Sequence, residues 1–330
     1  HILYEDYRRT YGQPLSVVLN VLEEIDRQIR LTEITSLSFT GSGGKSFLPL
    51  LGGEFINEII AHGKAVAHFH PEVRTVIEIG GEDSKLIFLT PKPGGGSRIL
   101  DFAMNTLCAA GTGAFLDQQA HRLGLKIEEF SRLALEAKNV PRIAGRCAVF
   151  AKSDMIHLQQ EGTPLSEIVA GLCYALARNL RGNIGRGKPF HKPIAFQGGV
   201  AANLGMRRAF CDILKLKPEE LIIPKHYLTM GAIGAALDAK ERQINNYHFS
   251  GLEKLKQAIV EEKEVKHFYP PLRLLKSRFE RSTLFEHKHK KIPVYLGIDV
   301  GSVSTNLVLI DEQGALLAKQ YLMTAGRPLE

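Results

Sequence analysis

The stretch Thr75-Val-Ile-Glu-Ile-Gly-Gly-Glu-Asp-Ser-Lys85 carries the pattern that decides the fold. Its first five residues are mostly β-branched or apolar, which predicts a buried strand that ends at the Gly80-Gly81 turn. A second strand is predicted to return from Ser84 to Thr90. Glycines at such a turn let the backbone come close to an anion and offer it N–H groups. The stretch therefore predicts a strand–turn–strand hairpin that is able to bind phosphate.

Two further glycine turns follow apolar strands. They are Asp299-Val-Gly-Ser-Val-Ser-Thr305 and Gln197-Gly-Gly-Val-Ala201. Acidic residues beside the first of these turns, and beside Gly80, could hold Mg²⁺ through water. A single Gly-Gly at a strand end is more often only a tight turn. Three glycine turns, two of them with acidic neighbours, together favour a nucleotide site.

Predicted strands alternate with predicted helices along most of the chain. The predicted strands cover residues 2–10, 34–40, 75–81, 84–90, 99–105, 193–197, 221–224, 293–300 and 305–311, with one more after Gly314. The predicted helices begin at Pro14 and cover 54–67, 206–214 and 230–240, with a largely helical stretch over 113–187. The same order of strands and helices occurs twice, which indicates an α/β protein with two related lobes.

The two ends of the sequence resemble each other. Residues 2–16 and 316–330 align without a gap at an offset of 314. The identical pairs are Leu3/Leu317, Tyr7/Tyr321, Thr10/Thr324, Gly12/Gly326, Pro14/Pro328 and Leu15/Leu329. Matches at this frequency indicate an internal repeat. Only the second copy follows a glycine turn, so we expect the chain to be one unit of a tandem protein, cut out of register.

This repeat predicts the domain organisation. We expect residues 1–73 and 292–330 to form the first lobe, with the C-terminal segment supplying the hairpin that the first copy lacks. The hairpin can come from the same chain, as a circular permutation, or from another chain, as a domain swap. Residues 74–245 are expected to form the second lobe, and 246–291 a helix and a linker to the next repeat.

The net charge of +7 is concentrated in that linker. Residues 251–291 hold 11 Lys and Arg against 6 Asp and Glu, so the rest of the chain is nearly neutral. A local basic stretch of this kind favours a solvated linker over a nucleic-acid-binding arm. No apolar run reaches the ~18–20 residues that span a bilayer, and no signal peptide is visible. We therefore expect a cytoplasmic protein that binds neither nucleic acid nor membrane.

The three glycine turns resemble the phosphate-1, phosphate-2 and adenosine motifs of the superfamily of acetate kinases, sugar kinases, heat-shock chaperone ATPases and actin. The stretch Asn105-Thr-Leu-Cys-Ala-Ala-Gly-Thr-Gly113 is similar to the first cysteine motif of the BadF/BadG/BcrA/BcrD-type ATPases. Members of that family activate 2-hydroxyacyl-CoA dehydratases or serve benzoyl-CoA reductases in anaerobic metabolism. Cys147-Ala-Val-Phe-Ala151 resembles its second cysteine motif. Further similar blocks are residues 40–44, 57–65 and 230–237.

The resemblance implies a two-lobed actin-like ATPase fold, built from duplicated ribonuclease-H-like halves, that binds ATP or ADP with Mg²⁺. The catalytic acids that it implies are Asp299, Glu78 and Glu82. The nucleotide contacts that it implies are Gly301, Ser302, Ser304, Thr305, Gly80, Gly81, Asp83, Ser84, Lys85, Gly198, Gly199, Val200 and Ala201. The chain departs from the family pattern at Glu78, Glu82 and Asn306, where the family usually has Asp, Gln and Lys. We expect these departures to weaken nucleotide binding.

The four cysteines are too few for a disulfide scaffold. Cys108 and Cys147 each precede a predicted helix, whose N–H groups would stabilise a thiolate. Without further motifs, a pair of cysteines is most simply interpreted as two small buried side chains. The resemblance instead implies that Cys108 and Cys147 from each of two protomers together hold one [4Fe-4S] cluster. A cubane needs four thiolates, which suits a symmetric homodimer or a tandem pseudo-dimer. Cys173 and Cys211 are expected in the core.

The resemblance implies an ATP-dependent activator that transfers electrons. Reduced ferredoxin or flavodoxin would load the cluster, and ATP would shift the lobes so that one low-potential electron passes to an iron–sulfur dehydratase or reductase partner. A small-molecule kinase of the same fold is an alternative, but it leaves the cysteine motifs unexplained. A nucleotide-gated scaffold without a redox role is a second alternative. His62 and Lys64 are predicted equally well as polar contacts in the cleft and as residues on a helix surface. His121 and His157 are predicted to be surface or helix-capping residues.

Overall fold

The structure is a computed structural model that describes residues 1–93, 96–105, 111–145, 147–245, 247–264, 291–301 and 304–323. It divides into two compact units, residues 1–152 with 165–265, and residues 153–164 with 266–330. Residues 265–290 of the expected helix and linker, together with Cys108, Ser302 and residues 324–330 of the second repeat copy, lie outside the described residues. The division at 73/74 and the pairing of 1–73 with 292–330 stay predictions.

The helices, in chain order, are α1 (Pro14–Gln28), α2 (Leu48–Leu51), α3 (Glu58–Phe69), α4 (Gly113–Arg122), α5 (Ile127–Leu133), α6 (Ala148–Gln160), α7 (Leu165–Asn179), α8 (Leu204–Leu214), α9 (Met230–Glu241) and α10 (Glu253–Glu264). The strands are β1 (Ser38–Phe39), β2 (Glu54–Phe55), β3 (Thr75–Ile79), β4 (Ser84–Pro91), β5 (Ser97–Asn105), β6 (Ile194–Gln197), β7 (Leu221–Ile222), β8 (Tyr295–Val300), β9 (Ser304–Ile310) and β10 (Leu316–Met323).

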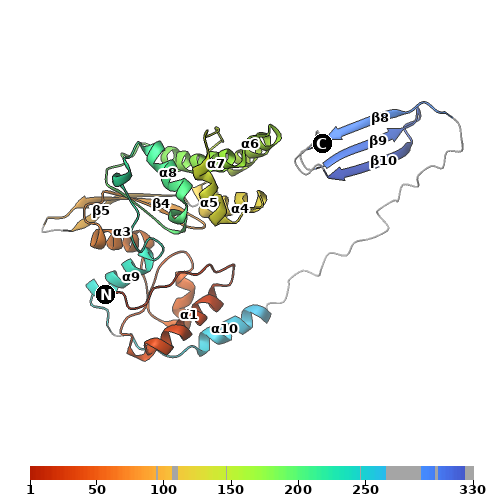
Figure 1. Cartoon of the computed structure of the whole chain (residues 1–330). Coiled ribbons are helices and arrows are strands. Elements are labelled where there is room, and N and C mark those ends of the chain that lie inside the picture. Colours follow the sequence, from red (N-terminus) through yellow and green to blue (C-terminus); the bar gives the residue numbers. More distant parts are fainter. Residues whose placement is uncertain are drawn as a thin grey trace. The chain divides into compact units, whose positions relative to one another are not determined.

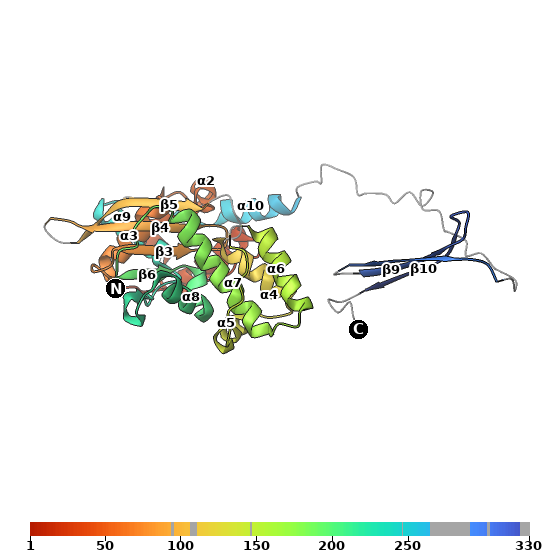
Figure 2. The same cartoon turned by 90° about the horizontal axis from the view of Figure 1, so that it is seen from above.

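A five-stranded sheet organises the first unit, with the order β5-β4-β3-β6-β7 (Figures 1 and 2). Strand β3 pairs antiparallel with β4, which places Glu78 opposite Lys85. On its other side β3 pairs in parallel with β6, which places Glu78 opposite Gln197. Because the carboxyl ends of parallel strands meet at one edge of a sheet, the turns that follow β3 and β6 lie next to each other. The two predicted glycine turns are thereby brought together.

Helices cover both faces of this sheet (Figure 1). On one face, Ile59 and Val66 of α3 pack with Val76 and Ile87 of the sheet in a buried core. Helix α9 packs against α3 so closely that a Cβ on Gly234 would lie 1.7 Å from the carbonyl oxygen of Ala61. On the other face, Phe196 of β6 meets Phe210 of α8 edge to face at 4.9 Å.

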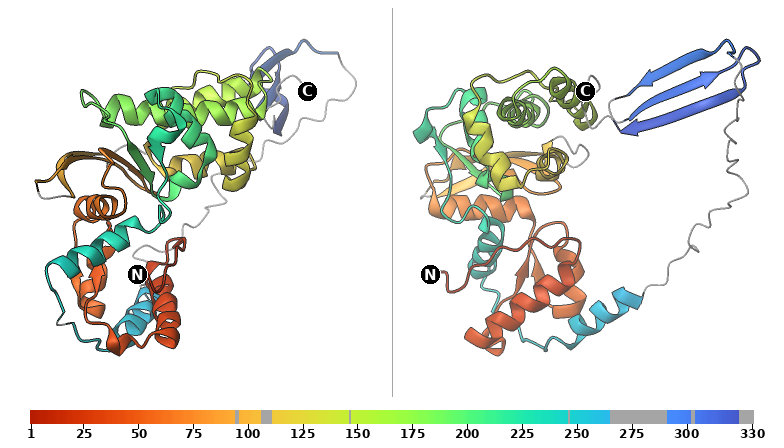
Figure 3. Two further views of the ribbon diagram at one scale, coloured as in Figure 1. Left: turned by 60° about the vertical axis from the view of Figure 1, so that its left-hand side comes forward. Right: turned by 45° about the vertical axis from the view of Figure 1, so that its right-hand side comes forward.

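A smaller core lies beside this layer. The apolar face of α1 and the side of α10 pack with residues of η2 (Gly44–Phe47) and α2 around Phe47, Leu51 and Leu255. Helices α1 and α10 lie side by side in both views of Figure 3. Pro14 stands in the first turn of α1, where its missing N–H costs nothing. The short parallel pair β1–β2 completes this part of the first unit.

The strand predicted for residues 2–10 is wrong, since this segment has no regular secondary structure. A strand needs a neighbour for its N–H and C=O groups. The repeat copy of the segment has such a neighbour, because residues Leu316–Met323 form β10 and pair with β9. The expected strand over 34–40 is reduced to β1, and the expected helix over 54–67 begins only at Glu58, where the Asn57 side chain caps it.

The second unit contains an antiparallel sheet with the order β10-β9-β8. Its strands agree with the three predicted after residue 292, and the register places Asp299 opposite Asn306. Large apolar side chains remain exposed along β8, among them Leu296 and Ile298. None of the helices in the described part of the chain combines the length and the hydropathy needed to cross a bilayer.

Candidate functional site

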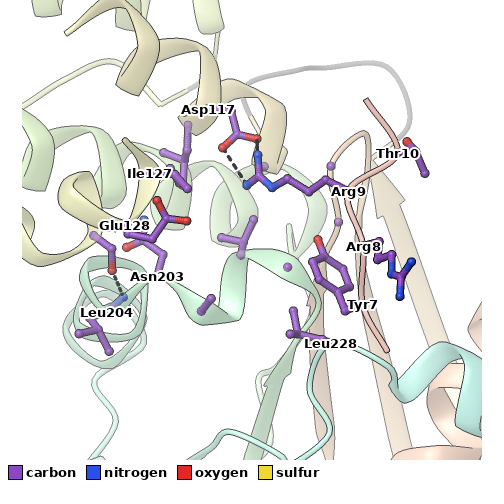
Figure 4. A pocket seen from close by; sticks show the side chains of 18 of the residues that line it. Tyr7, Arg8, Arg9, Thr10, Asp117, Ile127, Glu128, Asn203, Leu204 and Leu228 are labelled. Carbon is purple, nitrogen blue, oxygen red and sulfur yellow. Dashed lines mark hydrogen bonds and ion pairs between the residues drawn. The ribbon is translucent and has the colours of Figure 1, made fainter. Parts of the chain in front are cut away.

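A cavity of about 730 Å³ lies in the first unit where β3 and β6 end (Figure 4). Its residues come from the N-terminal segment 7–11, from the two glycine turns, from α4 and α5, from the start of α8, and from Leu228. Four of the predicted nucleotide contacts line it, namely Gly80, Gly81, Gly199 and Val200. These two turns are 118 residues apart in the sequence, and the fold brings them to one cavity. Their contact with nucleotide stays a prediction.

Backbone geometry requires glycine at the base of this cavity. Gly198 has a φ of +88°, and a Cβ there would lie 2.4 Å from the carbonyl oxygen of Ile79. A Cβ on Gly113 would lie 2.7 Å from the carbonyl oxygen of Gly80. By contrast, a Cβ on Gly81 would meet nothing within 4 Å. The Gly80-Gly81 turn is therefore open towards the cavity and closely packed against α4 behind it.

Helix α4 begins directly on this turn. The N–H groups of Gly113 and Ala114 donate to the carbonyl oxygens of Gly80 and Gly81, at 2.8 and 2.9 Å. These donors belong to the first turn of the helix, where backbone N–H groups have no partner within the helix. The segment that carries the first cysteine motif therefore runs straight into hydrogen bonds with the expected phosphate turn.

Several residues of the cavity were missed by sequence reasoning. Arg9 pairs with Asp117 of α4 at 3.1 Å, across the mouth of the cavity (Figure 4). The Tyr7 hydroxyl lies 3.0 Å from the position that a Cβ on Gly199 would take. Asn203 caps α8 through the N–H of Met206, and the Ser131 hydroxyl accepts the N–H of Leu204. No local motif marks these residues, although the repeat does mark the segment that holds Tyr7 and Arg9.

Lys85 is buried among carboxylates. Its Nζ lies 2.6 Å from Asp83, 2.9 Å from Glu78 and 3.3 Å from Glu58, and the residue is 2% exposed. Burial opposes the charge of Lys85, but Glu78 and Asp83 outweigh it and hold the pKa of Lys85 above its usual value. Burial, and the nearby charge of Asp83, raise the pKa of Glu78, while Lys85 opposes that rise.

Lys85 therefore serves first as the cation that holds the phosphate turn in shape. Its partners include Glu58, which stands in the first turn of α3. Its predicted contact with nucleotide stays a prediction, as do those of Asp83 and Ser84. Glu82 is exposed beside the same turn, and Ala201 is buried behind Val200.

His62 of α3 contacts the buried Gln197 of β6, with its Nδ1 2.8 Å from Nε2 of the amide. The contact joins a helix to the strand that leads into the Gly198-Gly199 turn. Burial, followed by the nearby charge of Lys85, lowers the pKa of His62 to about 4. Lys64, on the same helix, forms an ion pair with Asp238 of α9 at 2.6 Å.

The pKa of His62 predicts an acid-sensitive fold. An unfolded histidine titrates near pH 6.5, so between about pH 6.5 and 4 the unfolded chain binds a proton that the folded chain excludes. Stability is therefore complete above pH 6.5 and falls as the pH drops. From pH 7 to pH 5 we expect a loss of about 1–2 kcal/mol in the free energy of unfolding. Urea unfolding at both pH values measures it.

The control for this prediction is a second histidine. The variant His62→Gln should remove most of the difference between the two pH values, because glutamine does not titrate. The variant His121→Gln, at an exposed position of α4, should keep it. An unchanged pH dependence in His62→Gln would show that other groups cause it.

The described cysteines have unlike environments. Cys147 is half-buried and stands at the start of α6, where its carbonyl oxygen accepts the N–H of Ala151. Cys173 is fully buried, which raises the pKa of its thiol to about 12. Burial also raises the pKa of the partly buried Cys211. These environments disfavour thiolates at Cys173 and Cys211, as expected for core residues.

Glycines flank both cysteine motifs, and two of them pack against the C-terminal end of α7. A Cβ on Gly111 would lie 3.2 Å from Oδ1 of Asn179. A Cβ on Gly145 would lie 2.5 Å from the carbonyl oxygen of Ala175, one turn earlier in the helix. The chain segments next to Cys108 and Cys147 therefore both pack against the C-terminal end of α7. Within the described ranges, no three His, Cys, Asp or Glu side chains gather as a metal site.

The remaining predicted residues lie in the second unit. Strands β8 and β9 form the predicted hairpin, and the N–H of Gly301 donates to the carbonyl oxygen of Ser304 at 2.9 Å. The Asn306 side chain donates to Asp299 at 3.3 Å. Thr305 pairs in the ladder opposite Val300. Contact between this hairpin and nucleotide stays a prediction.

Comparisons with known proteins agree with the resemblance in the sequence. The model of the BadF/BadG/BcrA/BcrD ATPase family matches residues 5–239. The activator of lactoyl-CoA dehydratase from Anaerotignum propionicum is 38% identical over 186 residues, which is 56% of this chain and 69% of that protein.

Two solved structures are also similar. One is component A of (R)-2-hydroxyglutaryl-CoA dehydratase from Acidaminococcus fermentans, with a TM-score of 0.62, 30% identity, and coverage of 70% of this chain and 86% of that one. The other is the activator of 2-hydroxyisocaproyl-CoA dehydratase from Clostridium difficile with bound ADPNP, with a TM-score of 0.59, 29% identity, and coverage of 76% and 85%.

Proposed function

The chain belongs to the BadF/BadG/BcrA/BcrD ATPase family, and on that premise we propose that it is an ATP-dependent activator of an iron–sulfur dehydratase or reductase that acts on CoA esters. It has the actin-like α/β fold of the dehydratase activators. The observation that carries the proposal is the pair of hydrogen bonds from Gly113 and Ala114 to the Gly80-Gly81 turn. They connect the expected phosphate site to the segment that contains Cys108.

We place the nucleotide in the cavity at the ends of β3 and β6. Its phosphates would lie against Gly80 and Gly81, where open space meets the backbone, and its adenosine against Gly198–Ala201. The far wall of the cavity supplies Ile127 and Leu204, whose apolar side chains suit a purine ring. Asp299, Glu78 and Glu82 are the acids proposed to serve Mg²⁺ and water.

The residues present also fit an iron–sulfur ligand set. Cys147 is half-buried at the start of α6, and thiolate sulfur is the usual ligand of iron–sulfur clusters. The segment carrying Cys108 is supported by the same helix end as the segment carrying Cys147. Two thiolates from one chain require two more, from a second copy or from the neighbouring unit of a tandem protein. A [4Fe-4S] cluster bound there would supply a one-electron carrier between reduced ferredoxin or flavodoxin and the partner enzyme.

Nucleotide and cysteines communicate through α4 in this proposal. A ligand that pulls on the Gly80-Gly81 turn also moves the carbonyl oxygens that hold the first turn of α4. Cys108 precedes α4 in the sequence. We therefore expect its position to differ between the ATP-bound and the ADP-bound protein. Differential affinity of ATP for the two arrangements is what makes such a switch possible.

The hairpin of the second unit is proposed to complete the site from a second copy of the chain. We expect Asp299→Ala to lower ATP hydrolysis at least about a hundredfold, as loss of a charged group at a reacting phosphate does. Gly199→Leu, which blocks the cavity, should be equally inactive. When the two variants are unfolded together and refolded as a mixture, a hairpin exchanged between chains restores sites that contain neither change. Phosphate release measures the recovered activity.

The mixture separates the two arrangements. Recovery of about a quarter of the wild-type rate indicates exchange between chains, since one in four random pairings joins an intact cavity to an intact hairpin. An inactive mixture indicates a hairpin that closes on its own chain. Wild-type hydrolysis by Asp299→Ala alone would contradict the role of the hairpin in either arrangement.

The function itself is tested with a partner enzyme. Oxygen-free protein, reduced by a one-electron donor, is mixed with an inactive 2-hydroxyacyl-CoA dehydratase and either ATP or ADP. We expect dehydration of the CoA ester only with ATP, and phosphate release that accompanies activation. Phosphorylation of a small alcohol by protein that contains no iron would instead support a kinase.

A further inference from the structure

Residues 5–10 form an irregular segment that supplies one wall of the cavity. The segment is held at two places. At the first, Glu5 contacts Nδ1 of His226 at 2.7 Å and accepts a hydrogen bond from the hydroxyl of Thr229, at the start of α9. At the second, the side chain of Arg9 extends from the segment towards α4 (Figure 4). The segment therefore connects the start of α9 to α4 along the cavity.

The contact between Arg9 and α4 is a two-pronged ion pair with Asp117. Nη1 of Arg9 donates to Oδ2 at 3.1 Å, and Nη2 donates to Oδ1 at 3.3 Å. Both side chains are nearly half exposed, Arg9 at 44% and Asp117 at 42%. An exposed pair of this kind changes an equilibrium constant by a factor of about five at most. Asp117 therefore holds Arg9 only weakly.

Asp117 stands close to the turn that we expect to bind phosphate. Helix α4 begins at Gly113, whose N–H donates to the carbonyl oxygen of Gly80. Asp117 follows Gly113 by four residues, which is about 6 Å along the axis of an α-helix. The guanidinium of Arg9 is therefore held about one helical turn from the phosphate turn, on a side chain long and flexible enough to reorient towards it.

The other charged side chains around the cavity have different surroundings. Lys85, beneath the phosphate turn, is shared by three carboxylates. Arg8 is paired with two carboxylates and points away from α4 (Figure 4). Arg132 and Glu128 line the cavity from α5, on the wall where we place the purine ring. Within the described cavity lining, Arg9 is thus the cation that faces α4 with a single carboxylate as its partner.

We propose that Arg9 is a phosphate-binding residue that exchanges partners: it pairs with Asp117 in this structure and with a phosphate group of the nucleotide once that ligand is bound. The proposal rests on the proposed function. A planar guanidinium presents the same two donors to a phosphate group as to a carboxylate. Hydrogen bonds to a charged ligand change an equilibrium constant by a factor of ~10–100, which exceeds the factor for the exposed ion pair. The exchange detaches residues 5–10 from α4 and attaches them to the nucleotide.

Isothermal titration calorimetry of the full chain with ATP, adenosine and inorganic triphosphate tests the exchange. We expect Arg9→Gln to weaken the binding of ATP and of triphosphate about tenfold, because a charge-assisted contact is lost. Adenosine has no phosphate group, so it should bind this variant as it binds the wild type. Equal losses for ATP and adenosine would show that Arg9 only supports the structure of the cavity, and would overturn the proposal.

A change of Asp117 should have the opposite sign. The variant Asp117→Asn removes the carboxylate that competes for Arg9, so ATP should bind about threefold more tightly. When Asp117→Asn is added to Arg9→Gln, little of this gain should remain. An equal gain in both backgrounds would indicate simple repulsion between Asp117 and the phosphates, and would overturn the exchange of partners.

A matched control makes the same change of charge elsewhere on α4. Arg122 is exposed at the end of this helix and does not line the cavity. The variant Arg122→Gln should bind ATP with wild-type affinity. A loss as large as that of Arg9→Gln would mean that any positive charge on this side of the protein has the same effect, which would contradict the assignment of Arg9.

The outcomes separate this inference from the function on which it rests. Wild-type affinity for ATP in Arg9→Gln would overturn the inference and leave the proposed function intact. Binding of inorganic triphosphate that depends on Arg9, in a protein that does not bind ATP, would support the exchange and contradict the proposed function. Wild-type protein that binds neither ATP nor triphosphate would contradict both.

Discussion

Replacing either Cys108 or Cys147 with serine is expected to remove essentially all bound iron from oxygen-free protein. A [4Fe-4S] centre shared by two chains has two ligands from each chain, so one substitution, present in both chains, removes two of the four thiolates. Serine keeps the size of the side chain but is a poor ligand for such a centre. Iron and sulfide assays after reconstitution, with the absorbance near ~400 nm that thiolate-bound clusters show, measure the loss.

The remaining cysteines provide the controls. Cys173 is fully buried and Cys211 partly buried, and the pKa of each thiol is raised. Folded Cys173→Ala and Cys211→Ala protein should therefore retain as much iron per chain as the wild type. Retention of a full cluster by Cys147→Ser would contradict the ligand assignment.

The second large effect concerns nucleotide. We expect Gly199→Leu to weaken ATP binding at least about a hundredfold, which corresponds to losing roughly two hydrogen bonds to a charged ligand. The added Cβ meets only the Tyr7 hydroxyl, at 3.0 Å, so the fold can accept the side chain while the cavity cannot hold nucleotide as well. Isothermal titration calorimetry with ATP and Mg²⁺ measures the dissociation constant.

A control with the same substitution tests for a general effect on folding. Gly182 is exposed, and a Cβ there would meet nothing within 4 Å. Gly182→Leu should bind ATP with wild-type affinity. Unchanged affinity in Gly199→Leu would move the nucleotide away from the β6 turn and would remove the basis for placing adenosine there.

The sequence predicted those parts of the site that follow from local pattern. Gly80 and Gly198 each end a run of buried residues, and two parallel neighbouring strands bring such ends together. The fold class was predicted from the repeated order of strands and helices and from the resemblance of the motifs, and the comparisons confirm it. Cys173 was assigned to the core from its apolar helical neighbours, and it is fully buried.

Other features depend on contacts between distant segments and could not be predicted locally. The strand expected over residues 2–10 is absent, whereas its repeat copy is a strand because β9 lies beside it. Lys85 was expected at the phosphates, yet Glu58, from a helix 27 residues earlier in the chain, shares its ammonium with Glu78 and Asp83. No local motif marks Arg9, and only the folded chain places it opposite Asp117 of α4.

The central claim, a nucleotide-gated activator with a shared cluster, is tested most directly by the iron and sulfide content of wild-type protein purified without oxygen. Two chains around one cubane predict about two iron atoms and about two sulfides per chain, lost on exposure to air. Protein that binds ATP but contains neither iron nor sulfide after anaerobic reconstitution would contradict the account.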